Sequence, residues 1–195
     1  MATLPNTHYT LDEYLEFERK SEYKSEYYNG EIFAMAGASR NHNEIGNQLT
    51  VLVGQHLRGA KCRGYGPDLR LATPGGLYTY PDLSVVCGQP QFSPRDRDTL
   101  INPTLLVEIL SPSTEAHDRG FKAKLYFKIE SLQQLLLIEQ DSYAVDLYTR
   151  QSDGNWLLQQ IEGPGAVVNL SSIGYTLRLS ELYERAVFEE QAHGA

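Results

Sequence analysis

Two carboxylates stand inside segments that are otherwise apolar. Glu108 interrupts the run at residues 104–110, which is typical of a strand covered on both faces, and Asp82 begins the run that ends at Val86. A carboxylate in such a place is costly unless it is paired or binds a cation. On neighbouring strands, the two would form an oxygen-rich site for Mg²⁺ or Mn²⁺. The alternative is a strand-end carboxylate in an ordinary salt bridge.

The segment after Glu108 adds a third group of candidates. Asp118, Lys122 and Tyr126 have the spacing i, i+4, i+8 and share one face of a helix. The adjacent apolar stripe predicts that this helix docks on the sheet, which places Lys122 at the border of the docked face. Asp118 and Tyr126 are secondary candidates. The alternatives are a surface ion pair between Asp118 and Lys122, worth under about 0.5 kcal/mol, and simple packing for Tyr126, which we favour.

The elements that position these groups follow from periodicity and turn signals. A capping box, Thr10 with Glu13, predicts a helix to about residue 19, and Asn29-Gly30 predicts a hairpin over residues 27–35. Apolar spacing predicts helices over residues 42–57, 115–129 and 179–188. Strands are expected over residues 64–72, 77–87, 104–110, 135–139, 144–150, 156–162, 167–170 and 175–177, with a polar loop over residues 89–102.

This order of elements predicts an α+β or α/β fold. Only one strand–helix–strand crossover is visible, over residues 104–139, so a mixed β-sheet flanked by helices fits better than a doubly wound parallel sheet. The 195 residues are expected to form a single domain. We expect residues 1–7 and 189–195 to be flexible.

Composition narrows the classes of protein. The net charge of −8 argues against a large basic nucleic-acid footprint and excludes a polybasic membrane anchor. Residues 51–128 are locally basic, however, which leaves room for weak, salt-sensitive binding of phosphates. No apolar run approaches the roughly 20 residues of a membrane span, and residues 1–13 carry no signal-peptide pattern. Cys62 and Cys87 lack metal-ligand spacing, so we expect reduced thiols in a cytoplasmic protein.

Several motifs together resemble a widespread bacterial family. They are Tyr-Pro-Asp at residues 80–82, the segment LVEILSPST at residues 106–114 and DRGFK at residues 118–122, with further matches at residues 9–14, residues 26–37 and His42. The family consists of candidate restriction endonucleases of uncharacterised function with the PD-(D/E)xK nuclease fold. The resemblance covers about residues 8–185. It implies a restriction-endonuclease-like core with extra β-hairpins.

The resemblance also implies catalytic roles. Asp82 and Glu108 would hold a divalent metal ion, Mg²⁺ or Mn²⁺, with the backbone carbonyl of Ile109 as a third ligand. The metal ion would polarise a phosphodiester and lower the pKa of an attacking water. The superfamily normally has a lysine two residues after the strand glutamate, but here that position is Leu110. Lys122 looks like the migrated replacement, which would orient the water or stabilise the transition-state charge.

Three more residues are secondary candidates. Glu26 resembles the acidic residue that the family carries upstream, which would complete the metal site. Asp68 lies in a predicted strand and would add a carboxylate near Asp82. His42 begins a predicted helix, and for it we favour a capping or surface role over a catalytic one.

The leading hypothesis is therefore a metal-dependent endonuclease that hydrolyses phosphodiester bonds of nucleic acid, with DNA as the expected substrate. One alternative is a non-catalytic module that keeps the fold and binds nucleic acid or protein. Another is a structural homodimer whose strand carboxylates form ordinary ion pairs. Cutting both strands of a duplex needs two active sites, so we also expect a homodimer. Its contact would come from residues 144–168 or from the N-terminal helix.

Overall fold

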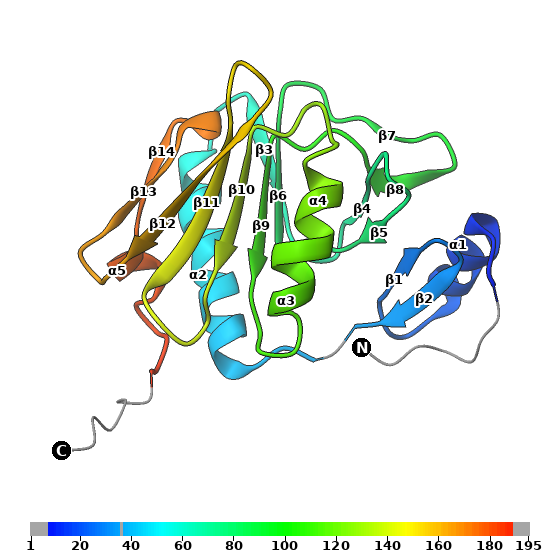
Figure 1. The fold of residues 1–195 in the computed structure, drawn as a ribbon, viewed down its shortest axis with the longest axis horizontal. Coiled ribbons are helices and arrows are strands. Elements are labelled where there is room, and N and C mark those ends of the chain that lie inside the picture. The colour runs from blue at the N-terminus through cyan, green and yellow to red at the C-terminus, as the bar shows by residue number, and fades with distance from the viewer. Residues whose placement is uncertain (1–7, 36, 189–195) are drawn as a thin grey trace.

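The computed structural model describes residues 8–35 and 37–188 (Figure 1), so the flexibility expected for residues 1–7 and 189–195 lies outside the described residues. Two six-stranded sheets and a two-stranded sheet are combined with a small number of helices. The helical segments are α1 (Leu11–Lys20), α2 (Arg40–His56), α3 (Glu115–His117), the π-helical turn η1 (Asp118–Lys122), α4 (Ala123–Tyr126), the 3-10 turn η2 (Ser171–Ile173) and α5 (Leu179–Leu182).

The central sheet has the strand order β12-β11-β10-β9-β6-β3. Its strands are β3 (Cys62–Tyr65), β6 (Leu83–Cys87), β9 (Leu105–Ile109), β10 (Gln134–Ile138), β11 (Ala144–Arg150) and β12 (Trp156–Glu162). β9 and β10 are parallel and are joined by α3, η1 and α4, whereas the other neighbours are antiparallel. The predicted crossover is therefore confirmed, and the strand–helix–strand order places the helix against this sheet.

The second six-stranded sheet has the order β2-β1-β5-β4-β8-β7 and packs beside α1. Its strands are β1 (Ser25–Tyr28), β2 (Glu31–Ala34), β4 (Arg70–Ala72), β5 (Tyr78–Thr79), β7 (Phe92–Ser93) and β8 (Asp96–Leu100). A separate two-stranded sheet pairs β13 (Val167–Leu170) with β14 (Tyr175–Arg178). The capping box of α1 is confirmed, as is the β1–β2 turn, where Asn29 and Gly30 have φ values of 48° and 87°.

Three sequence predictions are wrong: two expected strands are each divided in two, and an expected loop contains strands. The strand expected over residues 64–72 is divided between β3 and β4, and that over residues 77–87 between β5 and β6, so each serves both sheets. The second break contains Pro81, which has no backbone N–H for a sheet ladder. Residues 89–102 were expected as a loop but contain β7 and β8.

Side chains of β9 alternate between two cores. Leu105, Val107 and Ile109 pack in the cluster that contains α2, whereas Leu106 belongs to the cluster that contains α4. Figure 1 shows these two helices on opposite faces of the central sheet. Since successive strand residues point to opposite faces, Glu108 faces the side of α3, η1 and α4. β9 is thus buried on both faces, which is why the residues on either side of Glu108 are apolar.

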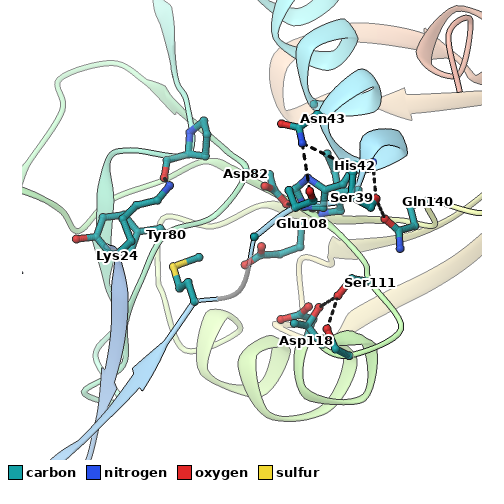
Figure 2. Close-up of a pocket in the computed structure, with 18 of the residues that line it drawn as sticks. Lys24, Ser39, His42, Asn43, Tyr80, Asp82, Glu108, Ser111, Asp118 and Gln140 are labelled. Carbon is teal, nitrogen blue, oxygen red and sulfur yellow. Dashed lines mark hydrogen bonds and ion pairs between the residues drawn. The ribbon is translucent and has the colours of Figure 1, made fainter. Parts of the chain in front are cut away.

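The start of α2, the end of β9 and the π-helical turn meet around one cavity of about 990 Å³ (Figure 2). Ser39 caps α2 by accepting a hydrogen bond from the backbone N–H of His42. Ser39 also donates to the side chain of Gln140, which follows β10, at 2.6 Å. These contacts fix the first turn of α2 at the rim of the cavity. In the described ranges, no helix is both long enough and apolar enough to cross a membrane.

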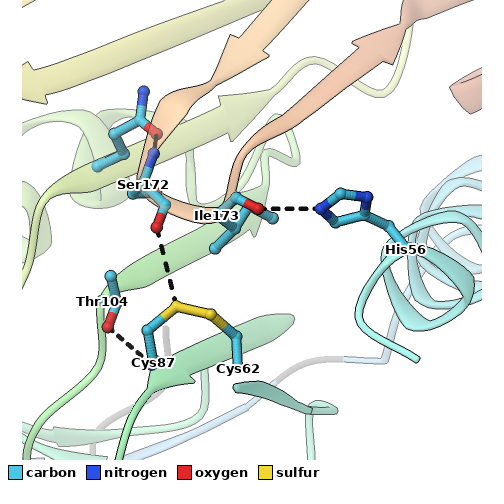
Figure 3. The surroundings of a disulfide bond; sticks show 7 residues. His56, Cys62, Cys87, Thr104, Ser172 and Ile173 are labelled. Carbon is cyan, nitrogen blue, oxygen red and sulfur yellow. Dashed lines mark hydrogen bonds between the residues drawn. A yellow bond between two sulfur atoms is a disulfide. The ribbon is translucent and has the colours of Figure 1, made fainter. Parts of the chain in front are cut away.

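Cys62 and Cys87 form a disulfide, so the prediction of reduced thiols is wrong (Figure 3). The two residues are direct partners in the antiparallel pair of β3 and β6. The sequence spacing gave no sign of this pairing, because the register between two strands 25 residues apart is set by the fold. A cytoplasmic location rested in part on reduced thiols and stays a prediction.

Loss of the disulfide is expected to lower the free energy of unfolding by about 3 kcal/mol, because the bond closes a loop of 25 residues in the unfolded chain. Urea unfolding with and without dithiothreitol measures the difference. The Cys62→Ser/Cys87→Ser double variant is the control, and it should match the reduced wild type and be indifferent to the reductant. Equal stability of oxidised and reduced wild-type protein would contradict the prediction.

Candidate functional site

The ammonium group of Lys122 lies among three carboxylates that come from different elements. Its Nζ atom is 2.7 Å from Oε1 of Glu108 in β9, 3.2 Å from Oε1 of Glu26 in β1 and 3.2 Å from Oδ1 of Asp118 in η1. All four side chains are only 4–6% exposed. Asp118 and Lys122 are therefore a buried pair, and their interpretation as a surface ion pair is wrong.

A π-helical turn brings Asp118 and Lys122 to this position. The backbone N–H of Ala123 reaches the carbonyl of Asp118, five residues back, which is the hydrogen bond of a π-helix. The extra residue in the turn changes which side chains face the sheet. Such turns frequently occur at functional sites. The sequence predicts a regular helix over residues 115–129, because the apolar spacing does not reveal the widened turn.

Arg119 holds the same turn from its other side. Its guanidinium forms ion pairs with Glu115, with Glu139 and with Asp146 of β11. Gln160 of β12 also donates a hydrogen bond to Asp146. The π-helical turn is thus attached to β11 through Arg119 and to β9 through Lys122. The guanidinium donates one charge-assisted hydrogen bond to each of three carboxylates, which restricts its orientation as well as supplying energy.

Tyr126 and Thr79 complete the hydrogen bonds of the buried carboxylates. The Tyr126 hydroxyl donates to Oε1 of Glu108 at 2.5 Å, and the Thr79 hydroxyl of β5 donates to Oε1 of Glu26 at 2.5 Å. The Tyr126 ring is fully buried in the cluster around α4. Tyr126 therefore both packs and hydrogen-bonds, whereas the sequence analysis favoured packing alone.

Tyr126→Phe is expected to lower the free energy of unfolding by about 2 kcal/mol, because it keeps the buried ring but removes one hydrogen bond and leaves a buried carboxyl oxygen of Glu108 without that donor. Urea unfolding at neutral pH measures the change. Tyr148→Phe is the matched control, since Tyr148 is half-buried and the described residues give its hydroxyl no hydrogen bond. That variant should stay within about 0.5 kcal/mol of wild type. Equal effects of the two substitutions would show that the Tyr126 hydroxyl contributes nothing specific.

Asp82 lies on the other side of Glu108, in the break between β5 and β6. Its Oδ2 atom accepts a hydrogen bond of 2.7 Å from the backbone N–H of Ile109 and lies 3.4 Å from Nε2 of His42. Burial acts to lower the pKa of His42, but the hydrogen bond and charge of Asp82 outweigh it and raise this pKa. His42 is therefore not the helix cap, because Ser39 caps α2. It is not a free surface residue either, because its ring pairs with Asp82.

The cavity brings most of the sequence candidates together. Its lining includes Glu26, His42, Asp82, Glu108, Ile109, Asp118 and Lys122. Figure 2 shows side chains from α2, from the β5–β6 break, from β9 and from η1 around one space. The segments are far apart in sequence, so only the fold makes them neighbours. Negative charge predominates, because the lining has four carboxylates against two lysines, Lys24 and Lys122, and one histidine.

This excess of negative charge changes the protonation of the buried groups. Burial raises the pKa of Glu108 to about 8, and the nearby Asp118 and Asp82 add to the rise although Lys122 opposes it. Burial acts to lower the pKa of Lys122, but Glu108, Glu26 and Asp118 outweigh it and raise this pKa well above its usual value. Lys122 therefore stays charged, and Glu108 is the carboxylate that takes up a proton when no other cation is present.

Asp68 is the one candidate that the structure places elsewhere. Its side chain is 92% exposed and pairs at 3.1 Å with Lys24, which lines the cavity, whereas Asp68 is not among the lining residues. The predicted carboxylate near Asp82 is therefore absent from that position. The sequence analysis also missed Lys24, Thr79 and Gln140, which line the cavity or bond to its carboxylates. Nothing in their local sequence marks them, because their partners are distant in the chain.

The donor atoms in this cavity fit a divalent cation held by few protein ligands. Mg²⁺ and Mn²⁺ take oxygen ligands, and Mg²⁺ is commonly held by one or two carboxylates plus waters and phosphates. Asp82, Glu108 and the Ile109 carbonyl offer such a set, and no described residue donates a hydrogen bond to Oε2 of Glu108. Within residues 8–35 and 37–188, no three His, Cys, Asp or Glu side chains form a ready metal cage. Water and substrate would supply the remaining ligands.

The mixed sheets and the parallel β9–β10 crossover define a restriction-endonuclease-like fold. A solved structure shares it: the chain described as a "putative nuclease belonging to DUF820" from Anabaena variabilis superposes with a TM-score of 0.75. The alignment covers 91% of this chain and 99% of that chain at 23% sequence identity, a level that establishes the fold alone.

The family follows from a sequence model. The model of the Uma2 family, described as "Putative restriction endonuclease", matches residues 11–180, so the chain belongs to this family. Two relatives come from Synechocystis sp. and are both described as uncharacterized proteins, slr1290 and sll1609. The first is 39% identical over 91% of this chain and 92% of its own length. The second is 35% identical over 83% of this chain and 92% of its own length.

Proposed function

We propose that this protein is a Mg²⁺- or Mn²⁺-dependent endonuclease that hydrolyses phosphodiester bonds of nucleic acid, with DNA as its substrate. The observation that carries the proposal is the convergence of Asp82, Ile109 and Glu108 on one cavity, beside the ammonium of Lys122. Membership of a family described as restriction endonucleases supports the same activity.

The chemistry assigns distinct tasks to the residues. Asp82, Glu108 and the Ile109 carbonyl would hold the cation, which supplies a polarised phosphate and a water of lowered pKa when bound. The backbone N–H of Ile109 holds the carboxylate of Asp82 in place. His42 lies beside Asp82 and is 20% exposed, so it faces the space that a phosphate would enter. A bound cation would also offset the negative charge that repels nucleic acid.

Cleavage assays with the purified chain test the proposal. Supercoiled plasmid, single-stranded DNA and RNA are incubated with Mn²⁺, with Mg²⁺ or with a chelator. We expect cleavage of DNA in either metal, no cleavage in the chelator, and loss of binding as salt rises. Binding without cleavage under every condition would instead favour the non-catalytic module.

We further propose that the chain acts as a homodimer, because cutting a duplex on both strands needs two such sites. β12 is an outer strand of the central sheet and lies within the predicted contact region 144–168. It exposes Leu157 and Leu158 by 50% and 42%, and no strand of the described residues pairs with its outer edge. Sedimentation at working concentration should give a dimer. A monomer that still cleaves both strands would contradict this part of the proposal.

A further inference from the structure

The ammonium group of Lys122 is surrounded by buried carboxylates from three elements. A lysine ammonium carries three N–H donors and no acceptor. Three carboxylate oxygens, from Glu108, Glu26 and Asp118, lie within 2.7–3.2 Å of Nζ. These separations are those of close ion pairs with an ammonium group and exceed the roughly 2.0–2.6 Å of Mg²⁺ or Ca²⁺ coordination. The three oxygens are therefore arranged around an ammonium group, which occupies the position completely.

The surroundings of Lys122 keep it in this position. Its side chain is 5% exposed, and Arg119 fixes the π-helical turn on which it stands. Its partner Glu26 is held by the Thr79 hydroxyl and Glu108 by the Tyr126 hydroxyl. A buried charge with several fixed partners is expensive to move, because leaving them uncovers charges that have been desolvated. Swinging Lys122 toward the substrate would leave three carboxylates facing one another.

We propose that Lys122 is a permanent internal cation that stands where a second divalent ion would otherwise bind, so that the site takes one metal ion per chain. Two-metal nuclease sites place two ions about 3.5–4 Å apart around shared carboxylates. Here Glu108 is the shared carboxylate, since both Lys122 and Tyr126 bond to its Oε1 atom while Oε2 remains for the metal ion. Lys122 is thus a positioning residue that acts through Glu108.

This inference rests on the proposed metal dependence, and a binding experiment separates the two. Free Mn²⁺ is followed by electron paramagnetic resonance while the purified full-length protein is titrated, without nucleic acid. The wild type should bind one Mn²⁺ per chain. Lys122→Met removes the charge but keeps an unbranched side chain, so it should bind two. Lys124→Met, at an exposed lysine two residues on, is the matched control and should bind one.

The number of Mn²⁺ ions bound per chain separates the internal-cation inference from the nuclease proposal. Two ions in the wild type, or one in Lys122→Met, overturn the internal-cation inference and leave the nuclease proposal standing. No Mn²⁺ bound by the wild type, or unchanged binding in Asp82→Asn, overturns the proposed function itself. Lys122→Met should also have a lower melting temperature than wild type in chelator, with a larger rise on addition of Mn²⁺.

A second variant covers the case in which Lys122→Met does not fold. Glu26→Gln leaves a neutral side chain whose oxygen can still face Lys122 and accept the hydrogen bond from Thr79. If Glu26 serves the ammonium, this variant binds one Mn²⁺ with an affinity within about threefold of wild type. If Glu26 is a metal ligand, as the family resemblance implied, the affinity falls by about tenfold or more, and the inference is overturned.

Discussion

Asp82→Asn is expected to lower the cleavage rate by about a thousandfold or more, with little change in the fold. A metal ion supplies several kcal/mol of transition-state stabilisation, and about 4 kcal/mol corresponds to a thousandfold in rate. The substitution removes the negative charge that would hold the ion. Asparagine keeps a side-chain oxygen that accepts the 2.7 Å hydrogen bond from the backbone N–H of Ile109. The local backbone is therefore preserved while the ligand charge is lost.

Single-turnover cleavage in Mn²⁺ measures the effect, and circular dichroism checks the fold. Asp98→Asn serves as the control, because Asp98 is an exposed aspartate on β8 that is not part of the cavity. It loses the same charge and should cleave as wild type does. Cleavage by Asp82→Asn within tenfold of wild type would show that this carboxylate does not hold the catalytic metal ion.

Local patterns were enough to predict most of the elements around the site. The capping box at Thr10, the Asn29-Gly30 turn and the apolar spacing of α2 depend on nearby residues, and all three are present. The parallel crossover also follows, because a helix between two apolar strands has few ways to pack. Element boundaries were less predictable where the chain passes from one sheet to the other, as at Pro81, since both halves of the segment read as strand.

The candidate site was predictable where one element determines it. Glu108 stands out because a charge in a strand buried on both faces has to be compensated, and Lys122 and Tyr126 share its side of the sheet. The contacts of Glu26 with Lys122 and Thr79 join three distant segments, which no local spacing encodes. The π-helical turn was hidden for a related reason: a regular helix explains the same apolar residues equally well.

Contacts between distant strands account for the largest errors. The disulfide requires β3 and β6 to be paired with Cys62 opposite Cys87, and two cysteines 25 residues apart give no indication of that register. The sequence predicts Asp68 near Asp82 because Asp68 falls within the strand expected over residues 64–72. The turn before β4 instead directs its side chain to solvent and to Lys24. In each case the global topology, and not the local sequence, decides which residues meet.

Glu108→Gln is expected to remove a pH dependence of stability while also abolishing cleavage. Burial raises the pKa of Glu108 from 4.5 to about 8. Between these values the folded chain holds a proton that the unfolded chain has released, so the free energy of unfolding falls as the pH rises. The loss is complete above pH 8 and is on the order of 5 kcal/mol in the metal-free protein. Glutamine has no proton to lose, and its oxygen still accepts hydrogen bonds from Tyr126 and Lys122.

Urea unfolding at pH 5 and pH 9 in the presence of a chelator measures this difference. Between pH 5 and pH 9 the free energy of unfolding should fall more for the wild type than for Glu108→Gln. The stability of the variant relative to wild type should therefore increase as the pH rises. Glu130→Gln is the control, because Glu130 is exposed on the segment that follows α4, and it should follow the wild-type pH dependence. Parallel curves for wild type and Glu108→Gln would show that Glu108 is already ionised at pH 5. The three carboxylates around Lys122 would then share its charge without taking up a proton, and a metal ion would bind at Glu108 without displacing one.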